Sequence, residues 1–475
     1  MTALSRLALL SGICSLLCVA GVVSAQTVMR KTAADAMTEV KSVDGKYISW
    51  REHRIDDSDL AGFRLGGADG LAITDLDRDG FPEVISVHED SAHVRIAFGT
   101  DDPDRWISFT LAEGTDLVGK VEDVALGDLN GDDRTDIVVA CEEEGHIVYF
   151  ECPEMPREMK AWKPVILEAT RGRGSWIWVD IADLDGDGKP EILAANKGGT
   201  TFSYFKLDGK SSDPSAWLES VLGETNVPIH IRAVDIDQDG DMDVFGGSRG
   251  EGNLVLFENL GGAAAWRTHA IYNKSSGNKL QVVDLNGDRR LDILFFGAVG
   301  KKGKKGYASV LQCLKQPDDL SSPWIAHELG RVEADVVAGK QLVDINGDGR
   351  LDLFVGGYST WGLKKDPETI DDSEIDAACG RLAWFEQPAE PLQTWPLHTV
   401  SRRRRGMFDM FVPFDVNRDR YVDLVTTRGE SGRGKDSSFD GVVWLEQVRT
   451  TQPRRNFTPA RVGDSPEIPL PLRLQ

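Results

Sequence analysis

The sequence predicts an all-β protein, a seven-bladed β-propeller with four-stranded antiparallel blades and a calcium-binding loop in each blade. Three observations lead to this prediction. An acidic nine-residue motif recurs seven times, short apolar runs rich in β-branched residues flank each copy, and two further apolar runs complete each period. Four antiparallel strands in a period of roughly 50 residues are typical of a propeller blade.

The composition is that of a folded, acidic protein. The chain has 475 residues, a hydrophobic content of 41% and a formal net charge of -23. This hydrophobic content is too high for a disordered acidic segment, and the lack of repeated long apolar spans excludes a polytopic membrane protein. The acidic balance also argues against nucleic acid as a partner, because contact with a phosphate backbone needs a basic surface.

The N-terminus has the features of an export signal. Arg6 precedes an apolar run over residues 7–23, and the small residue Ala25 predicts cleavage before Gln26. The run is long for a signal core, so an uncleaved anchor stays open as an alternative. We expect an exported protein, whether secreted, periplasmic or at the cell surface, with no membrane span after cleavage. The expected segments are a signal peptide over residues 1–25, a linker over 26–45, the propeller over 46–463 and a tail over 464–475.

The motif reads DxDxDGxxD or DxNxDxxxD, and its copies, numbered here as loops 1 to 7, start 49 to 71 residues apart. Calcium binds six to eight oxygen atoms, and carboxylates at positions 1, 3 and 5 of a tight loop can converge on one ion. The backbone carbonyl of position 7 and the carboxylate of position 9 would complete the cage, so up to seven Ca²⁺ ions are expected. The predicted ligands are Asp75, Asp77, Asp79, Phe81 and Glu83; Asp128, Asn130, Asp132, Arg134 and Asp136; Asp183, Asp185, Asp187, Lys189 and Glu191; Asp235, Asp237, Asp239, Asp241 and Asp243; Asp284, Asn286, Asp288, Arg290 and Asp292; Asp344, Asn346, Asp348, Arg350 and Asp352; and Asp415, Asn417, Asp419, Tyr421 and Asp423.

Position 6 of the motif separates the loops into two groups. Glycine there permits the positive φ of the turn, but Asp133, Arg289 and Arg420 replace it in loops 2, 5 and 7, where we expect weaker sites.

An EF-hand is excluded because position 12 is never acidic and the flanking segments are strand-like. The side chains at the ligand positions include 24 carboxylates. Their mutual repulsion predicts that metal binding and folding are coupled.

The remainder of each period supplies the other strands. One apolar run ends in an aromatic and acidic signature, as in Trp384-Phe385-Glu386, and another carries a tryptophan near its start. We expect these tryptophans to pack between blades rather than to stack on a ligand. They are Trp106, Trp162, Trp217, Trp266, Trp324 and Trp395. Both residues 50–55 and residues 457–462 match the last strand of a period, so one terminal segment is expected to close the ring, and the sequence leaves open which one.

As a set, these loops resemble the FG-GAP/VCBS repeat family, the calcium-loop β-propellers related to those in integrin α-subunit heads. The resemblance covers about residues 46–463 and departs from the family pattern at the missing glycines and in the insertion over residues 358–379. It implies a propeller stabilised by calcium. Propellers similar to this one also form the catalytic bodies of some carbohydrate-eliminating enzymes.

The face opposite the loops is expected to carry the ligand site. Side chains five and three residues before each motif would share one side of the inner strands, and the other side is mostly apolar. The polar side chains would line the mouth of a central channel, either as a ligand site or as a structural network. The expected ligand-binding residues are Asp123, Trp178, Asp180, His230, Arg232, Lys279, Gln281 and Gln341.

Basic runs should lie on the same face and could attract an anionic partner. They are residues 402–405 and the lysines between residues 301 and 305. Solvated loops are the commoner explanation of such runs, and an exported protein meets an acidic polysaccharide more readily than nucleic acid.

The preferred function is therefore an exported calcium-binding propeller that binds a carbohydrate or an extracellular protein at the face opposite its loops. No nucleophile, metal-hydrolase or phosphate-binding motif is present, so the sequence leaves enzymatic activity open. The alternative is a carbohydrate lyase or dehydratase at the channel mouth. In that case His230 or Lys279 would abstract a proton, Arg232 would hold the developing anion, and Asp123 would lie within reach.

Overall fold

The computed structural model describes residues 32–249, 254–273, 279–301, 306–358, 379–403, 406–429, 440–461 and 467–468. The predicted signal peptide, most of the insertion over residues 358–379 and most of the predicted C-terminal tail lie outside these residues.

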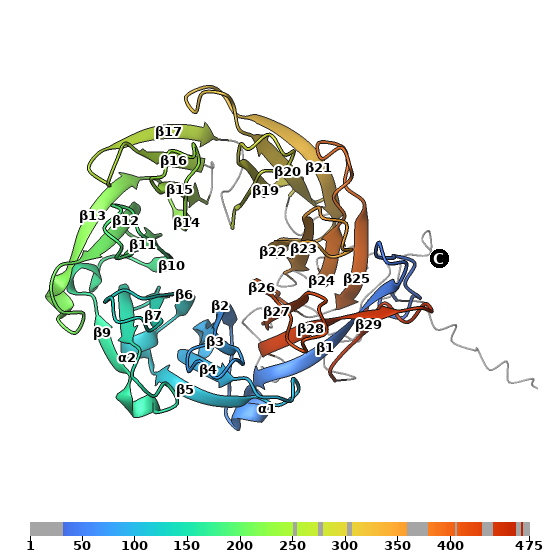
Figure 1. The fold of residues 1–475 in the computed structure, drawn as a ribbon, viewed down its shortest axis with the longest axis horizontal. Helices are drawn as coiled ribbons and strands as arrows, with labels where there is room; N and C mark the ends of the chain where they lie inside the picture. The colour runs from blue at the N-terminus through green and yellow to red at the C-terminus, as the bar shows by residue number, and fades with distance from the viewer. Residues whose placement is uncertain are drawn as a thin grey trace, which may run out of the picture. The chain divides into compact units, whose positions relative to one another are not determined.

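Seven antiparallel blades surround a common centre (Figure 1). In blades 1 to 6 the four strands follow one another along the chain from the centre outward. Blades 1 to 3 contain β2 (Ala68–Thr74), β3 (Glu83–His88), β4 (His93–Phe98) and β5 (Ile107–Glu113); β6 (Val121–Gly127), β7 (Asp136–Cys141), β8 (His146–Glu151) and β9 (Lys163–Ile166); and β10 (Trp176–Ala182), β11 (Glu191–Asn196), β12 (Thr201–Leu207) and β13 (Trp217–Glu224). Blades 4 to 6 contain β14 (Pro228–Val234), β15 (Asp243–Ser248), β16 (Leu254–Asn259) and β17 (Trp266–Tyr272); β18 (Gln281–Val283), β19 (Asp292–Val299), β20 (Ala308–Lys315) and β21 (Ile325–Glu333); and β22 (Val337–Val343), β23 (Asp352–Gly357), β24 (Gly380–Phe385) and β25 (Leu397–Arg403).

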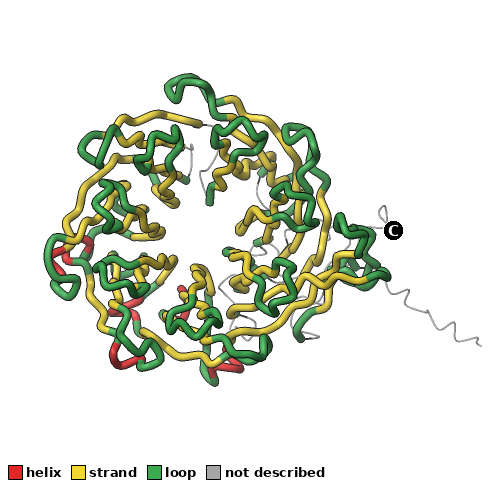
Figure 2. The backbone as a smooth tube through the Cα atoms, in the orientation of Figure 1, coloured by secondary structure: helices red, strands yellow, loops and turns green. Residues whose placement is uncertain are grey.

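Among the described residues, helix is confined to single turns, most of which lie toward the outside of the ring (Figure 2). These turns are α1 (Ser58–Ala61), α2 (Thr115–Val118) and the 3-10 turns η1 (Glu89–Ser91), η2 (Met159–Ala161), η3 (Glu168–Thr170) and η4 (Pro214–Ala216). The predicted all-β class, the seven blades and the four antiparallel strands of each blade are confirmed.

Blade 7 joins the two ends of the chain. It contains β26 (Phe411–Phe414), β27 (Asp423–Arg428), β28 (Gly441–Thr450), β1 (Tyr47–Asp57) and β29 (Phe457–Thr458), in that order from the centre. The N-terminal strand β1 pairs antiparallel with β28, and the short β29 adds to its other edge in parallel. Both terminal segments that match the last strand of a period therefore take part in closure.

The core lies between neighbouring blades. Ile85 and Val87 of blade 1, for example, pack in one cluster with Ile137 and Trp162 of blade 2. The tryptophans at the start of the outer strands belong to these clusters, as predicted from the sequence. Trp162, Trp217, Trp324 and Trp395 are 1 to 6% exposed, whereas Trp106 and Trp266 are only half-buried.

A buried ionic cluster fixes the closing strand. Glu52 of β1 pairs with Arg403 of blade 6 at 2.9 Å and with Arg428 of β27 at 3.3 Å, and it accepts the N–H of Ala460 at 3.1 Å. Arg402 and Arg403 are 5% and 3% exposed. The expectation that they belong to a solvated basic run facing a ligand was wrong, because β25 places them inside the protein; residues 404–405 lie outside the described residues.

We expect Glu52→Gln to lower the free energy of unfolding at pH 7 by about 3–5 kcal/mol, because it removes the buried negative charge that faces Arg403 and Arg428. Burial alone would raise the pKa of Glu52, but Arg403 and Arg428 outweigh it and hold the pKa at about 2, below the ordinary 4.5. This stabilisation is complete above the unfolded-state pKa and is lost as the pH falls toward 2. Urea unfolding should therefore show a smaller difference between variant and wild type at acidic pH than at pH 7.

Glu113→Gln is the matched control, because Glu113 is 70% exposed and faces His93 at 3.5 Å on β5. Its effect should stay below about 1 kcal/mol. Equal losses from the two substitutions would contradict the role assigned to Glu52.

Candidate calcium loops and ligand site

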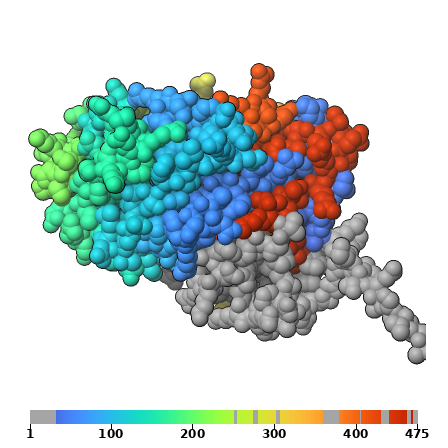
Figure 3. All heavy atoms as spheres, turned by 90° about the horizontal axis from the view of Figure 1, so that it is seen from below, coloured from blue at the N-terminus to red at the C-terminus, as the bar shows by residue number. Residues whose placement is uncertain are grey.

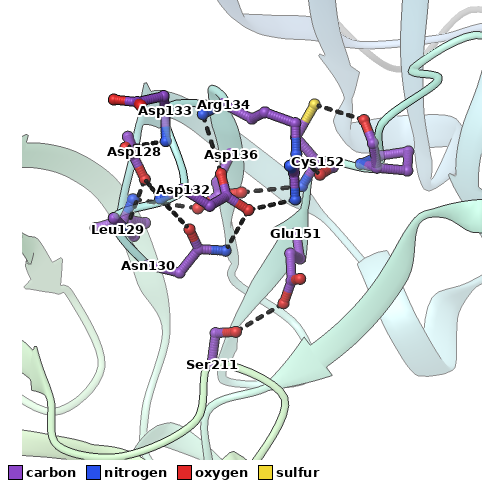
Figure 4. Close-up of polar contacts among 12 residues, drawn as sticks. Asp128, Leu129, Asn130, Asp132, Asp133, Arg134, Asp136, Glu151, Cys152 and Ser211 are labelled. Carbon is purple, nitrogen blue, oxygen red and sulfur yellow. Dashed lines mark hydrogen bonds and ion pairs between the residues drawn. The ribbon is translucent and has the colours of Figure 1, made fainter.

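The acidic loops are built as chains of turns in which carboxylates accept backbone N–H groups. In loop 2, Oδ1 of Asp128 accepts the N–H groups of Gly131 and Asp132 at 2.8 and 3.1 Å (Figure 4). Its Oδ2 accepts the N–H of Asp133 at 2.7 Å. In all seven loops the N–H of position 7 donates to the carboxylate of position 5, at 2.8 to 3.0 Å. The turns therefore direct the side chains of positions 1, 3 and 5 toward the inside of the loop.

Every loop has positive φ at positions 4 and 6. At position 6, Asp133, Arg289 and Arg420 adopt φ values of 64°, 69° and 74°, close to the 83° of Gly188. The turn predicted from glycine is thus kept where glycine is missing. A side chain with a Cβ in this region costs about 1–2 kcal/mol, so the backbone at position 6 is strained in loops 2, 5 and 7.

Non-glycine residues at position 4 connect consecutive loops. The backbone also has positive φ at Arg78, Gln238 and Arg418. Each donates a hydrogen bond to the position 6 carbonyl of the next loop: Arg78 to Asp133, Gln238 to Arg289, and Arg418 to Gly80 across the closure. The guanidinium of Arg418 also lies 4.3 Å from the ring centre of Phe81. These contacts join blades at the loop face.

An aspartate at position 9 ties its loop to the end of the blade's third strand, in loops 2, 4, 5, 6 and 7. Oδ2 of Asp136 accepts the N–H of Leu129 at 3.1 Å, and Oδ1 accepts the N–H of Cys152 at 2.9 Å (Figure 4). Loops 4, 6 and 7 repeat both hydrogen bonds. In loop 5, Oδ1 of Asp292 accepts the N–H of Gln316 at 2.9 Å, but Oδ2 is buried without a hydrogen-bond partner among the described residues.

Glutamate occupies position 9 in loops 1 and 3. Oε2 of Glu83 accepts the N–H of Leu76 at 2.6 Å, while Oε1 is buried without a hydrogen-bond partner among the described residues. Ligand oxygens of Asp75, Asp77 and Glu83 lie within 4.8 Å of one another. Burial raises the pKa of Glu83 to about 8, with the aspartates of the loop adding to the effect. A buried carboxylate oxygen without a partner, beside two aspartates, fits a hard cation such as calcium.

Three loops gather carboxylates in this way within the described residues. They are loops 1, 3 and 4, through Asp75, Asp77 and Glu83, through Asp183, Asp185 and Glu191, and through Asp235, Asp237 and Asp239. All three have aspartate at position 3 and glycine at position 6. In the other four loops, asparagine at position 3 donates its amide to the position 5 carboxylate, at 3.1 to 3.2 Å. The residue at position 3 therefore distinguishes the loops with clustered carboxylates from the others more clearly than the residue at position 6 does. The prediction from the sequence used position 6.

Basic side chains neutralise part of this charge. Arg157 pairs with the aspartates of loop 1, and Lys206 pairs with those of loop 3. Arg134, Arg290 and Arg350 pair with the position 5 carboxylates of loops 2, 5 and 6. Among the described residues, none of the ion pairs involves Asp235, Asp237 or Asp239 of loop 4.

The residue at the end of the third strand links each loop to the preceding blade, a role that sequence reasoning missed. In blades 4 to 7 this residue is Asn259, Gln316, Gln387 or Gln447, and its N–H donates to the position 9 carboxylate. Its side-chain amide donates to the position 2 carbonyl of the preceding loop. These hydrogen bonds run from Asn259 to Leu184, Gln316 to Ile236, Gln387 to Leu285 and Gln447 to Ile345, at 2.8 to 3.1 Å. For Asn259, Gln387 and Gln447 the signal was their position directly after the aromatic and acidic signature, whereas Gln316 follows Leu314 and Lys315 and had no such signal.

On the inner strands, three of the predicted ligand-binding residues connect blades instead of facing a ligand alone. Asp123 is buried and accepts the N–H of Val179 at 3.1 Å. Asp180 accepts the N–H of Ala233 at 3.0 Å, and Gln281 accepts that of Leu342 at 3.3 Å. Gln341 donates to the carbonyl of Leu342, and Arg232 is exposed. The structural network that the sequence left open is therefore present.

Trp178, His230 and Lys279 are brought together. The rings of Trp178 and His230 meet edge to face with centres 4.5 Å apart, and Nζ of Lys279 lies 5.7 Å from the centre of the Trp178 ring. Lys279 is 7% exposed and pairs with Asp409, whose backbone carbonyl it also contacts at 2.9 Å. Lys279 is thus engaged in an ion pair and is poorly placed to act as a base.

The alternation of side chains expected from the sequence did not identify Asp69, Lys340 and Asp409. These three residues share the environment of Trp178, His230 and Lys279. The inner strands of five blades change register near their start, for example between Ala68 and Leu71 and between Val337 and Lys340. Such a bulge shifts the alternation of side chains by one residue. We use the name inner-strand cluster for Asp69, Asp123, Trp178, His230, Lys279, Lys340 and Asp409.

Glycine allows the inner strands to approach closely at two points. A Cβ on Gly70 would lie 2.7 Å from Cα of Asp123, and one on Gly339 would lie 2.6 Å from the carbonyl oxygen of Asp409. The backbones that carry the cluster therefore lie in direct contact across blades.

Burial controls ionisation in the cluster. It raises the pKa of Asp69, with Asp409 and Glu89 adding to the effect, and raises the pKa of Asp123 to about 7. It lowers the pKa of Lys340 to about 7, with help from the charge of Lys279, and lowers that of His230 well below its usual range. Oδ2 of Asp69 and Nδ1 of His230 are buried without a hydrogen-bond partner among the described residues. His230 is consequently neutral at pH 7.

An acidic group lies on blades 1 and 2 at the strand ends away from the loops. Carboxylate oxygens of Glu89, Glu122 and Glu142 lie within 4.8 Å of one another. Lys197 pairs with Glu142, and Lys120 lies 3.8 Å from Glu89. Two lysines therefore neutralise part of the charge of this acidic group.

We expect Arg289→Gly to raise the free energy of unfolding by about 0.5–1 kcal/mol, because glycine adopts the positive φ of position 6 without strain. Arg289→Ala is the control, since it removes the same guanidinium but keeps a Cβ. Urea unfolding should rank the glycine variant above wild type and above the alanine variant. An alanine variant as stable as the glycine variant would show that the guanidinium, not the backbone, matters.

A family model supports the repeat, and two known proteins are similar to the chain. The model of the FG-GAP-like repeat matches residues 183–246 and 235–295. Cartilage acidic protein 1 of Xenopus tropicalis is 24% identical over 331 residues, which are 62% of this chain and 48% of that protein, so the match spans about half of the relative's length. Among solved structures, an Agrocybe aegerita lectin that recognises non-reducing terminal N-acetylglucosamine is similar, with a TM-score of 0.43, 14% identity, and coverage of 72% of this chain and 82% of that one.

Proposed function

We propose that this chain, which carries FG-GAP-like repeats in a seven-bladed β-propeller, is an exported calcium-binding protein that binds a carbohydrate or protein ligand at the face opposite its acidic loops. The observation that carries the proposal is the inner-strand cluster. There, buried polar atoms without partners lie beside aromatic rings at the beginning of the inner strands.

A ligand would offset the free-energy cost of the buried polar atoms in this cluster that lack hydrogen bonds. A buried polar atom that lacks a hydrogen bond costs about 1–3 kcal/mol. Oδ2 of Asp69 and Nδ1 of His230 are two such atoms, and hydroxyl or amide groups could satisfy both. The edge-to-face pair of Trp178 and His230 adds aromatic surface beside Nδ1 of His230. Hydroxyl groups beside apolar C–H faces are the chemistry of sugars, and protein side chains offer the same combination.

Calcium is supported by the acidic loops themselves. Loops 1, 3 and 4 supply carboxylates within 4.8 Å of one another, and loop 1 adds the unpartnered Oε1 of Glu83. We propose that these three loops hold the ion most tightly and that the asparagine-containing loops hold it more weakly. Bound calcium would supply the positive charge that such closely spaced carboxylates need.

Export is supported by the apolar N-terminal segment, which ends in small residues. In the part of the chain that the structure describes, no helix is long and apolar enough to cross a membrane. Extracellular calcium would suit loops of moderate affinity, since extracellular modules bind it in the range of about 10⁻⁴–10⁻³ M.

Removing calcium should lower the melting temperature. An ion present at 100 times its dissociation constant stabilises the folded state by about 2.7 kcal/mol per site, so several sites produce a large shift. Melting curves followed by circular dichroism, in EDTA and in excess Ca²⁺, measure it. Asp237→Asn should reduce the shift more than Asn417→Ala, because loop 4 gathers three carboxylates and loop 7 does not. Identical melts in both conditions would refute the linkage between metal and folding.

A glycan and protein array tests the ligand site. His230→Ala and Trp178→Ala should weaken any bound ligand at least tenfold, because they remove one polar and one aromatic contact. Arg267→Ala on the outer strand of blade 4 is the control, since Arg267 is 58% exposed and pairs with Glu258. Hits that keep their affinity in both cluster variants would exclude the inner-strand cluster as the binding site.

A carbohydrate lyase or dehydratase is the second candidate, and one observation favours it. His230 combines an unpartnered Nδ1 with a neutral ring near two lysines, which suits a base that abstracts a proton α to a carboxylate. Lys279 and Lys340 would stabilise the resulting anion, in place of the exposed Arg232. Ultraviolet absorbance of an unsaturated product, lost in His230→Ala, distinguishes this candidate from simple binding.

A further inference from the structure

A separate pocket lies on the outer wall of the ring, between the closing blade and blade 1. Its volume is about 540 Å³, within the range of small-molecule sites. Its walls come from the end of β1, the α1 segment that follows it, and the first half of β5. Figure 3 shows this wall, with the blue surface of the N-terminal strand against the cyan surface of blade 1. None of its lining residues belongs to the inner-strand cluster.

Aromatic carbon forms one side of this outer-wall pocket. Trp106 occupies the same place in blade 1 as the buried outer-strand tryptophans of blades 2, 3, 5 and 6, yet it is only half-buried and lines the pocket. Its Nε1 donates to the carbonyl of Pro103 at 3.0 Å, so the polar atom of the ring is already engaged within the protein. Phe63 is 39% exposed and also lines the pocket. The two rings offer apolar surface without a hydrogen-bonding edge.

Three arginines form the polar side. Arg95 is held by both oxygens of Asp56, at 2.8 and 3.3 Å, and by the hydroxyl of Thr110. Arg54 pairs with Asp57, which also caps α1 by accepting the N–H groups of Asp59 and Leu60. These contacts fix two guanidinium groups and the α1 wall before any ligand arrives.

Arg105 completes the charge of the pocket. Its side chain is exposed and forms no ion pair with the described residues, whereas the neighbouring carboxylate of Asp104 contacts His53. Guanidinium binds carboxylate through two parallel hydrogen bonds. The hydroxyls of Ser108 and Thr110 line the same pocket and add donors and acceptors for further hydroxyl groups. An available guanidinium, hydroxyl groups and flat aromatic surface therefore meet in one place.

We propose that the outer-wall pocket binds an acidic saccharide, a sugar ring that carries a carboxylate. The C–H face of the sugar lies on Trp106, the carboxylate lies on Arg105, and the hydroxyl groups reach Ser108. A neutral sugar would leave Arg105 without a partner, and an aromatic carboxylate would leave the hydroxyl groups of the pocket unused. The site lies beyond the ligand site proposed above, because it stands on the outer strands and uses none of the same residues.

Isothermal titration of the calcium-loaded full chain with trigalacturonate, galactotriose, sulfated galactotriose and phenylacetate tests the proposal. We expect trigalacturonate to bind and the other three to bind at least tenfold more weakly. Arg105→Glu and Trp106→Ala should each reduce trigalacturonate affinity at least tenfold. Trp266→Ala is the matched control, because Trp266 is also a half-buried outer-strand tryptophan but does not line the pocket. It should keep wild-type affinity.

Several outcomes would overturn the proposal. Absence of trigalacturonate binding, equal binding of galactotriose, or tighter binding of sulfated galactotriose or phenylacetate would each show that the ligand class is wrong. Wild-type affinity in Arg105→Glu, whose side chain is exposed and whose fold can be checked by its melting curve, would show that the ligand binds elsewhere. If His230→Ala abolished binding while Arg105→Glu did not, the acidic saccharide would belong to the inner-strand cluster, so the outer-wall site would fail and the proposed function would stand.

Discussion

The hydrogen bonds of the position 9 carboxylate are the contacts on which the rest of the ring depends. In loop 4, Asp243 accepts the N–H of Ile236 in its own loop and the N–H of Asn259 at the end of the third strand. The amide of Asn259 then reaches the carbonyl of Leu184 in the preceding blade. One buried carboxylate thus orders a loop, fixes it to its blade and, through one side chain, positions that blade against its neighbour. Repetition of this arrangement gives a sheet-based ring a polar framework beneath its apolar blade contacts.

The sequence predicted the fold well because the decisive signals are local. Carboxylate spacing predicts the turns, β-branched runs predict the strands, and tryptophans such as Trp217 predict packing between blades. Closure was not predictable in the same way, because the pairing of Tyr47 with Thr450 joins residues from opposite ends of the chain. Two strands with the same local pattern competed for that role, and both are used.

The candidate site was predicted less well, and for two physical reasons. Bulges at the start of the inner strands shift the side-chain alternation, so Asp69, Lys340 and Asp409 were assigned to the wrong side or overlooked. In addition, a polar side chain at the junction of two blades can bind a ligand or bond to the neighbouring blade. Asp123 and Asp180 satisfy backbone N–H groups of the next blade, and Arg403 neutralises Glu52, although each has the composition of a ligand-binding residue. Sequence alone records the charge of a side chain but not which backbone group lies within its reach.

The placement of the first strand, β1, in the last blade has a consequence for biogenesis. Of the strands of the ring, β1 is made first, whereas its partner β28 is made only after all the strands of blades 1 to 6. Until then β1 has no edge to join, and blade 7 cannot form. Contacts of such large sequence separation are slow to form, and unpaired strands invite association with other chains. The ring therefore closes only after the chain has been made as far as β28, and a fragment that stops before β28 would carry an unpaired strand for chaperones or proteases to recognise.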